Sequence, residues 1–380
     1  MAKAAVGQIC SSNSMAHNLE QCVKLVGQAA AAGAKILFLP EASDYIGTSA
    51  QESLSLAKPI STSPFVAGLR SAAAKHQLAV HVGIHVPVSV KPSTTTSNPV
   101  LSSIPQSEDP DSISSTTTST ATSTSSRNNP ASVEGQEEKA QGQTEPPPTN
   151  LKLKLYNRTI YIHPDGTLHP AASYDKLHLF DYPDAQLRES TTTQAGANFT
   201  PPFDSPVGRL GSLICFDLRF PEPALHLTTT TTSSTSTSTS TSSSSSPSSL
   251  KSYPSPAQIL LYPSAFTVPT GTAHWEVLLR SRAIETQSYV IAAAQVGLHN
   301  PGLSPRVSYG RSMVVDPWGR VLLSLKGVMG GGGGGGGGDG KDAEDGAVGQ
   351  LGVVEIDLGE WERVRRNMPL VRRTDVYPEV

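Results

Sequence analysis

Short apolar runs alternate with longer amphipathic stretches along the chain. Residues 4–10 form a first apolar run, and from about Ala16 apolar positions recur at the spacing of three and four that predicts a helix. Gly33 is a favourable residue to end that helix. A second apolar run, residues 35–41, contains Pro40 near its end. A strand, a helix and a strand at this spacing predict a parallel pair joined by a crossover.

The same alternation continues to the end of the chain. It predicts helices over 65–76, 222–227 and 274–286, strands over 78–88, 151–162, 259–263, 289–295 and 312–315, and a basic, partly helical tail over 361–373. Turn signals follow two of the strands, at residues 164–166 and 316–319. This number of elements predicts an α/β fold, with two sheets in contact or one large sheet.

Three stretches interrupt the pattern. Residues 92–150 are rich in Ser, Thr, Pro and Gln, residues 228–249 are almost entirely Thr and Ser, and residues 330–347 are a Gly run followed by small and acidic residues. Such segments bury too little apolar surface to offset chain entropy, so we expect them to be disordered insertions. What remains is a single domain over 1–373, followed by a tail over 374–380.

Composition excludes several classes of protein. A net charge of −3 gives no indication of a nucleic-acid or anionic-membrane partner. Three Cys are too few for a disulfide scaffold and favour a reducing compartment. No apolar run approaches the length of a membrane span, and the strand-like start leaves no room for a signal peptide. We expect a cytoplasmic protein, with the mitochondrion as the alternative.

The stretch 207–222 carries the first candidate for chemistry. Leu210, Leu213 and Ile214 indicate a buried strand, and Cys215 stands where this strand gives way to a sharp turn that ends on Pro221. A thiol at the end of a buried strand is presented by a rigid support, as a nucleophile requires. A buried structural cysteine is the alternative interpretation.

Two further candidates lie at strand ends. Glu41 directly follows a predicted parallel strand, on the edge where ligands bind in such sheets. Lys176 falls in a predicted strand among apolar neighbours, and a Lys is seldom buried without a partner. Each also has a plain interpretation, as a solvated acid or a surface lysine. His81 and His85 are interpreted as satisfied or surface histidines, because four residues along a strand span about 13 Å, too far for shared metal ligation.

Taken together, the segments 38–45, 174–181 and 213–222 resemble the nitrilase, or carbon–nitrogen hydrolase, superfamily. The resemblance implies a four-layer α-β-β-α sandwich that pairs into homodimers, and a catalytic triad of Glu41, Lys176 and Cys215. A second active-site Glu of the family matches Glu189, which precedes a Ser. No cofactor and no metal ion are implied.

The implied chemistry suits these residue types. A thiolate is a far better nucleophile than a thiol, so Cys215 would attack an amide carbon while Glu41 accepts its proton as general base. Lys176 would stabilise the oxyanion or donate a proton, together with the backbone N–H of Phe216. The products would be ammonia and a thioester, which water hydrolyses to a carboxylic acid.

Within the superfamily, the segments 41–46, 262–266, 274–279, 283–287 and 292–295 resemble the branch that acts on deaminated glutathione. The ω-amidase branch, which acts on 2-oxoglutaramate, is the alternative. Arg219 is a candidate for binding a substrate carboxylate, because a guanidinium matches a carboxylate bidentately; a structural ion pair with Glu222 or Asp217 is equally compatible with the sequence. Arg311 occupies a position where relatives usually have His.

Other classes of protein fit less well. A papain-like Cys–His hydrolase lacks the expected residues around its cysteine. A non-catalytic binding protein and a redox thiol at Cys215 remain as alternatives, although the other two cysteines, Cys10 and Cys22, are remote in sequence.

Overall fold

The computed structural model describes residues 1–91, 151–182, 187–229, 255–329, 342–373 and 375–377. The predicted insertion at 92–150 lies outside the described residues, as do most of those at 228–249 and 330–347. The predicted insertions at 228–249 and 330–347 each include residues that belong to the folded domain. Thr228 is the buried last residue of a helix, and Ala347 is fully buried in a turn that packs on the core.

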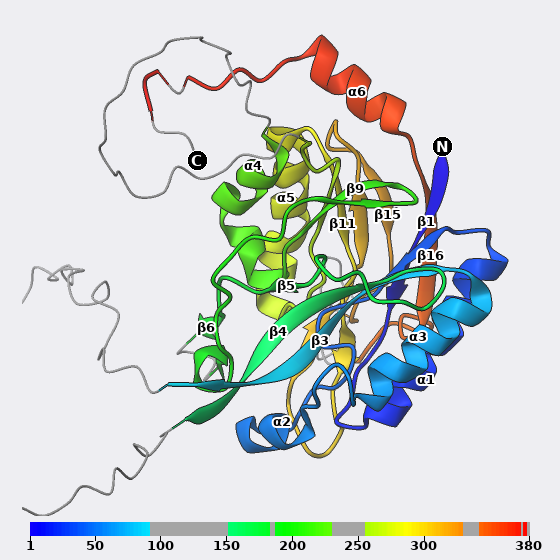
Figure 1. Ribbon diagram of the computed structural model, residues 1–380, viewed down its shortest axis with the longest axis vertical. Helices are drawn as coiled ribbons and strands as arrows, with labels where there is room; N and C mark the ends of the chain where they lie inside the picture. Colours follow the sequence, from blue (N-terminus) through cyan, green and yellow to red (C-terminus); the bar gives the residue numbers. More distant parts are fainter. Residues whose placement is uncertain (92–150, 183–186, 230–254, 330–341, 374, 378–380) are drawn as a thin grey trace, which may run out of the picture. The chain divides into compact units, whose positions relative to one another are not determined.

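One six-stranded sheet is built around the N-terminal strand (Figure 1). Its order is β16 (Gln350–Ile356), β1 (Ala2–Gln8), β2 (Ile36–Phe38), β3 (Ala79–Val90), β4 (Lys152–Ile162) and β5 (Tyr174–Asp175). The three strands β1, β2 and β3 are parallel, while β16 and β5 pair antiparallel with their neighbours. The predicted strand–helix–strand crossover at the start of the chain is confirmed.

The second six-stranded sheet repeats this plan. Its order is β15 (Val321–Ser324), β14 (Met313–Val315), β11 (Tyr289–Ala292), β10 (Ile259–Leu261), β9 (Gly208–Ser212) and β8 (Phe203–Ser205). Strands β9, β10 and β11 are parallel, with antiparallel strands on either side. Two small sheets pair β12 (Val296–Leu298) with β13 (Val307–Tyr309), and β6 (Asp181–Tyr182) with β7 (Leu187–Arg188).

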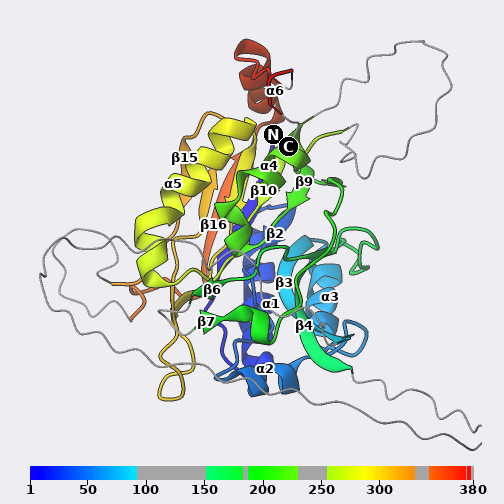
Figure 2. The same ribbon diagram turned by 90° about the vertical axis from the view of Figure 1, so that its left-hand side faces the viewer.

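Helices cover the outer face of each sheet (Figure 2). These covering helices are α1 (Met15–Ala31), α3 (Pro64–His76), α4 (Pro221–Thr228) and α5 (Val268–Thr286). The short helix α2 (Ala50–Leu56) packs against a small cluster around Tyr45, and α6 (Leu358–Asn367) follows β16 and packs against the cluster between the sheets. One apolar cluster joins α1 and α3 to the first sheet, and a second joins α4 and α5 to the second sheet. A third cluster contains residues of both sheets, so the sheets pack face to face. The predicted four-layer α-β-β-α sandwich is confirmed.

Local sequence accounts for most element boundaries. Helix α3 begins after the Ser63 side chain, which accepts the Val66 N–H, and has Pro64 in its first turn, where a missing N–H costs nothing. It ends at Gln77, which adopts the left-handed conformation. The prediction of a helix over 65–76 is therefore right to one residue.

Three predictions needed correction. Helix α5 begins at Val268, six residues before the predicted start, because Thr267 and the following proline provide a favourable first turn. Lys176 directly follows β5 and is not within a strand. The strand β16, which the pattern analysis missed, alternates buried and partly exposed residues and pairs along its whole length with β1. Among the described residues, none of the helices combines the length and apolar character needed to cross a bilayer.

Candidate active site

The turn after β2 presents Glu41. Glu41 is only 5% exposed. The next residue, Ala42, has a φ of +54°, a conformation that non-glycine residues rarely adopt. Gly83 of β3 packs beneath this turn, where an added Cβ would lie 2.7 Å from the Glu41 Cα. From the other sheet, Gln295 donates from Nε2 to the Glu41 carbonyl at 2.9 Å. Contacts remote in sequence therefore hold the turn.

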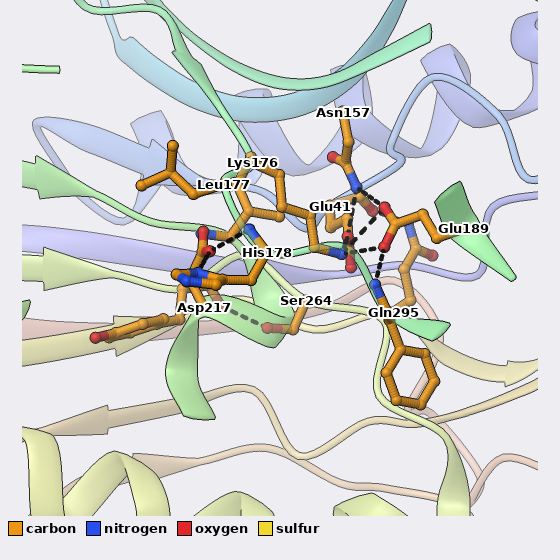
Figure 3. Close-up of polar contacts among 12 residues, drawn as sticks. Glu41, Asn157, Lys176, Leu177, His178, Glu189, Asp217, Ser264 and Gln295 are labelled. Atoms are coloured by element: carbon orange, nitrogen blue, oxygen red, sulfur yellow. Dashed lines mark hydrogen bonds and ion pairs between the residues drawn. The ribbon is translucent and has the colours of Figure 1, made fainter. Parts of the chain in front are cut away.

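Lys176 lies across the strand pair from Asn157, whose carbonyl accepts the Lys176 N–H at 2.9 Å. Its side chain is only 2% exposed and its ammonium is fully engaged. Nζ lies 3.0 Å from Glu41 Oε1, and 2.9 and 3.2 Å from the two carboxylate oxygens of Glu189 (Figure 3). Burial alone would lower the pKa of Lys176, but the charges of Glu189 and Glu41 raise it well above its usual value, so the lysine stays cationic.

Asn157 completes this buried polar cluster. It belongs to the face of β4 whose alternate residues, including Leu155 and Thr159, point into the protein. Its Nδ2 donates to Glu41 Oε1 at 2.6 Å and to Glu189 Oε1 at 3.1 Å. One amide nitrogen therefore bridges the same two carboxylates that Lys176 bridges (Figure 3).

Glu189 opens a short 3₁₀ turn directly after β7. Besides its contacts with Lys176 and Asn157, its Oε2 accepts the backbone N–H of Phe180 at 2.8 Å. The acid that the family resemblance singled out thus lies beside Glu41 and Lys176, and its partners are all donors.

Cys215 begins the 3₁₀ turn Cys215–Arg219 that follows β9, with a φ of +47°. Its backbone N–H donates to the Pro263 carbonyl at 3.0 Å, and its thiol lies beside the Glu41 carboxylate, whose charge acts on it. Burial and the negative charge of Glu41 raise the pKa of this thiol far above its usual value, although Lys176 opposes the effect. Such a thiol stays protonated until a base removes its proton.

Glu41 is suited to be that base. Burial alone would raise the pKa of its carboxyl group, but the Lys176 ammonium and the hydrogen bonds from Cys215 and Asn157 hold the pKa below its ordinary value of 4.5. Glu41 is therefore ionised at neutral pH while its neighbour Cys215 is neutral. The structure thus places Glu41, Lys176 and Cys215 beside one another, and their catalytic roles stay a prediction.

A buried carboxylate, Asp217, ties the cysteine turn to the lysine segment. Its oxygens accept the Ile214 N–H at 3.0 Å, the Tyr174 hydroxyl at 2.7 Å, and both the backbone N–H and Nδ1 of His178 at 3.0 and 2.7 Å. Tyr174 and His178 flank Lys176 in sequence, so a single side chain sets the spacing of the lysine and the cysteine. Figure 3 shows this second group of contacts beside the first.

The other predicted site residues lie near the cysteine but outside this cluster. The Arg219 guanidinium stacks over the Phe216 ring, 6.0 Å from its centroid, and lies 2.8 Å from His274 Nδ1. The ion pairs considered for Arg219, with Glu222 or Asp217, are not found among the described residues. Arg311, at the position where the resemblance leads us to expect His, forms an ion pair with Glu344 at 3.4 Å, and both side chains are 34% exposed.

The two histidines of β3 are satisfied, as predicted. His81 is buried, lies 3.1 Å from the Ser212 hydroxyl, and has a pKa that burial lowers to about 3. His85 pairs with Asp44 at 3.0 Å. Within the described part of the chain, no group of three or more His, Cys, Asp or Glu side chains is arranged to hold a metal ion.

Sequence reasoning missed the residues that support the reactive groups: Gly83, Asn157, Asp217 and Gln295. One signal was available for Asn157, because it is a polar residue on the buried face of an alternating strand. Asp217 lies within the segment 213–222, yet nothing in that segment distinguishes a buried acceptor from a solvated acid.

Comparison with known proteins agrees with this geometry. The family model described as carbon–nitrogen hydrolase matches residues 3–104 and 102–366. The chain is 34% identical over 385 residues to the probable hydrolase nit2 of Schizosaccharomyces pombe, with 100% of both chains covered. It is 32% identical to the deaminated glutathione amidase of Mus musculus, covering 98% of this chain and 84% of the relative.

A solved structure shares the fold. The crystal structure of the C. elegans NitFhit protein superposes with a TM-score of 0.64 and 29% identity, covering 99% of this chain and 67% of that one. With the family model matching almost the whole chain, the protein belongs to the carbon–nitrogen hydrolase family.

Proposed function

We propose that this hydrolase cleaves the terminal amide of deaminated glutathione through a thioester on Cys215, with release of ammonia. The mammalian relatives named for this activity align over 98% of the chain, which supports the choice of substrate. The observation that carries the mechanism is the buried contact of the neutral Cys215 thiol with the ionised Glu41, beside the Lys176 ammonium.

In the first half of the reaction, Glu41 takes the proton from Cys215 as the sulfur attacks the amide carbon. The carbonyl oxygen gains a negative charge, which the Lys176 ammonium and the backbone N–H of Phe216 stabilise. Glu41 then passes the proton to the nitrogen as the C–N bond breaks. Ammonia leaves, and the acyl group remains on sulfur as a thioester.

In the second half, a water molecule occupies the position that ammonia has left. Glu41, ionised again, removes a proton from this water as it attacks the thioester carbon. The carbon–sulfur bond breaks, the proton returns to Cys215, and the carboxylic acid is released. Glu189 acts on this cycle through Lys176, whose ammonium it holds in place.

Arg219 and Phe216 are proposed to bind the substrate away from the reacting bond. The Arg219 guanidinium is half-buried, stacks on Phe216 and contacts the His274 ring, with no acid contact among the described residues. A cation held in this way beside the cysteine turn is suited to the carboxylate end of a dicarboxylic amide.

The test is ammonia release by the purified protein from deaminated glutathione and from 2-oxoglutaramate, measured side by side. We expect a higher kcat/KM for deaminated glutathione, and a loss of at least about 10⁴-fold in Cys215→Ala. Cys22→Ala is the matched control, because it removes a buried thiol remote from the site and should retain activity.

The other outcomes are informative. A preference for 2-oxoglutaramate would keep the mechanism and assign the ω-amidase activity. Activity that survives in Cys215→Ala would overturn the mechanism. A folded protein that releases ammonia from neither compound, nor from other small amides, would favour a non-catalytic binding protein.

Two further features belong to the proposal. We propose a homodimer, supported by the exposed apolar Val277 and Ile284 on α5; sedimentation at the monomer mass of 39.9 kDa would contradict it. We also propose a cytoplasmic location, since all three cysteines are free thiols. Fluorescence microscopy of a tagged full-length chain distinguishes the cytoplasm from the mitochondrion.

A further inference from the structure

Two carboxylates share the same two donors in the buried site. Glu41 Oε1 and Glu189 Oε1 both lie within hydrogen-bond distance of Lys176 Nζ, at 3.0 and 3.2 Å, and of Asn157 Nδ2, at 2.6 and 3.1 Å. Two nitrogens, one cationic and one neutral, therefore hold two acidic oxygens close to each other. Lys176 alone cannot neutralise both acids, because it carries a single positive charge.

The orientation of the Asn157 amide follows from its partners. An ionised carboxylate only accepts hydrogen bonds, so the amide must direct its NH₂ group at the two acids, and each of its two protons then has one carboxylate partner. Asn157 Oδ1 is buried and has no hydrogen-bond partner within the described part of the chain. The Asn157 amide therefore donates both of its protons to the two carboxylates, while its oxygen accepts no hydrogen bond from the described residues.

Carboxylates this close ordinarily share a proton. In a site of low polarity, one member of such a pair is held protonated by the charge of the other. A proton shared between Glu41 and Glu189 would occupy the atom that has to receive the Cys215 proton. The pair therefore requires extra donors if Glu41 is to remain a base.

We propose that Asn157 is a positioning residue that keeps the Glu41–Glu189 pair free of a shared proton, so that Glu41 stays available as the base for Cys215. This rests on the proposed function for its role in catalysis, but the effect on the Cys215 thiol is independent of the substrate. Asn157 does not touch the cysteine in the contacts described; it acts through the two acids.

The proposal predicts the direction in which removal of the Asn157 amide shifts the pKa of Glu41. A donor to an ionised carboxylate stabilises the charged form, so loss of the Asn157 donor raises the pKa of Glu41. For any reaction that needs ionised Glu41, the acid limb of the pH–rate profile, where the rate rises as Glu41 loses its proton, then moves to higher pH. A role confined to folding would lower the yield or the stability of the protein without moving that limb.

The experiment measures alkylation of Cys215 by iodoacetamide as a function of pH, followed by mass spectrometry of the Cys215 peptide. In Asn157→Leu, which has a similar size but no donor, we expect the acid limb to move up by about one pH unit, or about a tenfold lower rate at a fixed pH on the limb. Asn157→Asp keeps the shape and places a third acid there, so it should move the limb further in the same direction.

The matched control is Thr159→Val. Thr159 lies two residues along the same face of β4, is fully buried, and its hydroxyl has no hydrogen-bond partner among the described residues. Its replacement alters the same buried face without removing a donor from the acids, so the limb should stay in place.

A double substitution tests whether the effect of Asn157 depends on the Glu41–Glu189 pair or on Glu41 alone. In a Glu189→Gln background the second charge is absent, so the shift caused by Asn157→Leu should shrink to less than half. A full-sized shift in that background would overturn the pairing argument, and an unmoved limb in folded Asn157→Leu and Asn157→Asp would overturn the proposal. Failure of the proposed amidase activity would leave these alkylation results unchanged, so the two failures are distinguishable.

Discussion

The turns that carry Glu41 and Cys215 have the same local form but different support. Each follows a parallel strand, β2 or β9, each is buried, and each contains a residue of positive φ, Ala42 or Cys215. The cysteine turn is braced from within, because Asp217, two residues further along, accepts the Ile214 N–H. The glutamate turn is braced from β3, β4 and the segment after β11.

The difference separates what a short segment specifies from what only the fold supplies. A strained turn persists only where surrounding contacts hold it. The segment 213–222 carries a carboxylate brace, Asp217, in addition to the bond from the Cys215 N–H to Pro263. The segment 38–45 has a hydroxyl brace, from Ser43 to the Pro40 carbonyl, and depends also on residues up to 254 positions away, such as Gln295. A change remote in sequence should therefore disturb the base selectively, and a change within the cysteine segment should disturb the nucleophile.

The largest effect should come from Asp217→Asn. This buried carboxylate has four partners, and an amide in its place turns an NH₂ group toward two of them. The Tyr174 hydroxyl and His178 Nδ1 can change from donor to acceptor, but the backbone N–H of Ile214 or His178 beside each of them cannot. Leaving buried donors unpaired costs about 2–4 kcal/mol of unfolding free energy, and we expect kcat to fall about 100-fold. Urea unfolding and steady-state kinetics measure the two.

If Asp217→Asn also moved the acid limb of Cys215 alkylation, the proposed difference between the supports of the two turns would be wrong. The comparison assigns this limb to Glu41, whose turn Asp217 does not touch in the contacts described. Tyr174→Phe offers a milder control, since it removes one donor and leaves the carboxylate in place.

Gly83→Ala should have an intermediate effect on the other turn. The new Cβ would lie 2.7 Å from the Glu41 Cα and 2.9 Å from the Pro40 carbonyl oxygen, and backbone atoms cannot rotate away as a side-chain end can. We expect a loss of about 1–3 kcal/mol in stability, and a drop of about 10-fold in kcat/KM from the displaced base. Wild-type kcat/KM in a folded Gly83→Ala protein would show that the glutamate turn yields easily.

The smallest effect is expected for Arg311→His, the residue that the family resemblance leads us to expect at this position. The Arg311–Glu344 pair is 3.4 Å long and a third exposed on both sides, and such pairs contribute roughly 0–1 kcal/mol. Thermal unfolding should change by a few degrees at most, and kcat/KM should stay within twofold of wild type. A larger loss of activity would place Arg311 in the site, against the contacts described here.

Sequence reasoning reached the elements and the reactive residues but not their supports. Element types followed from periodicity, as for α3 and β3, because each pattern is local. Glu41 and Cys215 were identifiable as residues that follow buried strands. Asn157 carried one signal, its place on the buried face of an alternating strand, but nothing in the pattern shows that it faces two carboxylates.

The helix α1 shows a second limit. The apolar pattern predicts one face made of Leu19, Cys22, Val23, Val26 and Ala30. Cys22 and Val26 are fully buried, but the other three are only partly buried, and Leu25 and Asn18 are fully buried as well. Asn18 is inside because its amide binds the carbonyls of Ser12 and Asp44, in the loops after β1 and β2. Such a partner is visible only once the fold brings the loops together.

The pairing of β1 with β16 has a consequence for the synthesis of this protein on the ribosome. The register joins Ala2 to Ile356 and Gln8 to Gln350, so β1 cannot pair on this side until β16 has been made. At roughly 5–20 residues per second, the nascent chain waits roughly 20–70 s with that apolar strand edge open. This interval is when the chain is most exposed to chaperones and to misassembly with its neighbours.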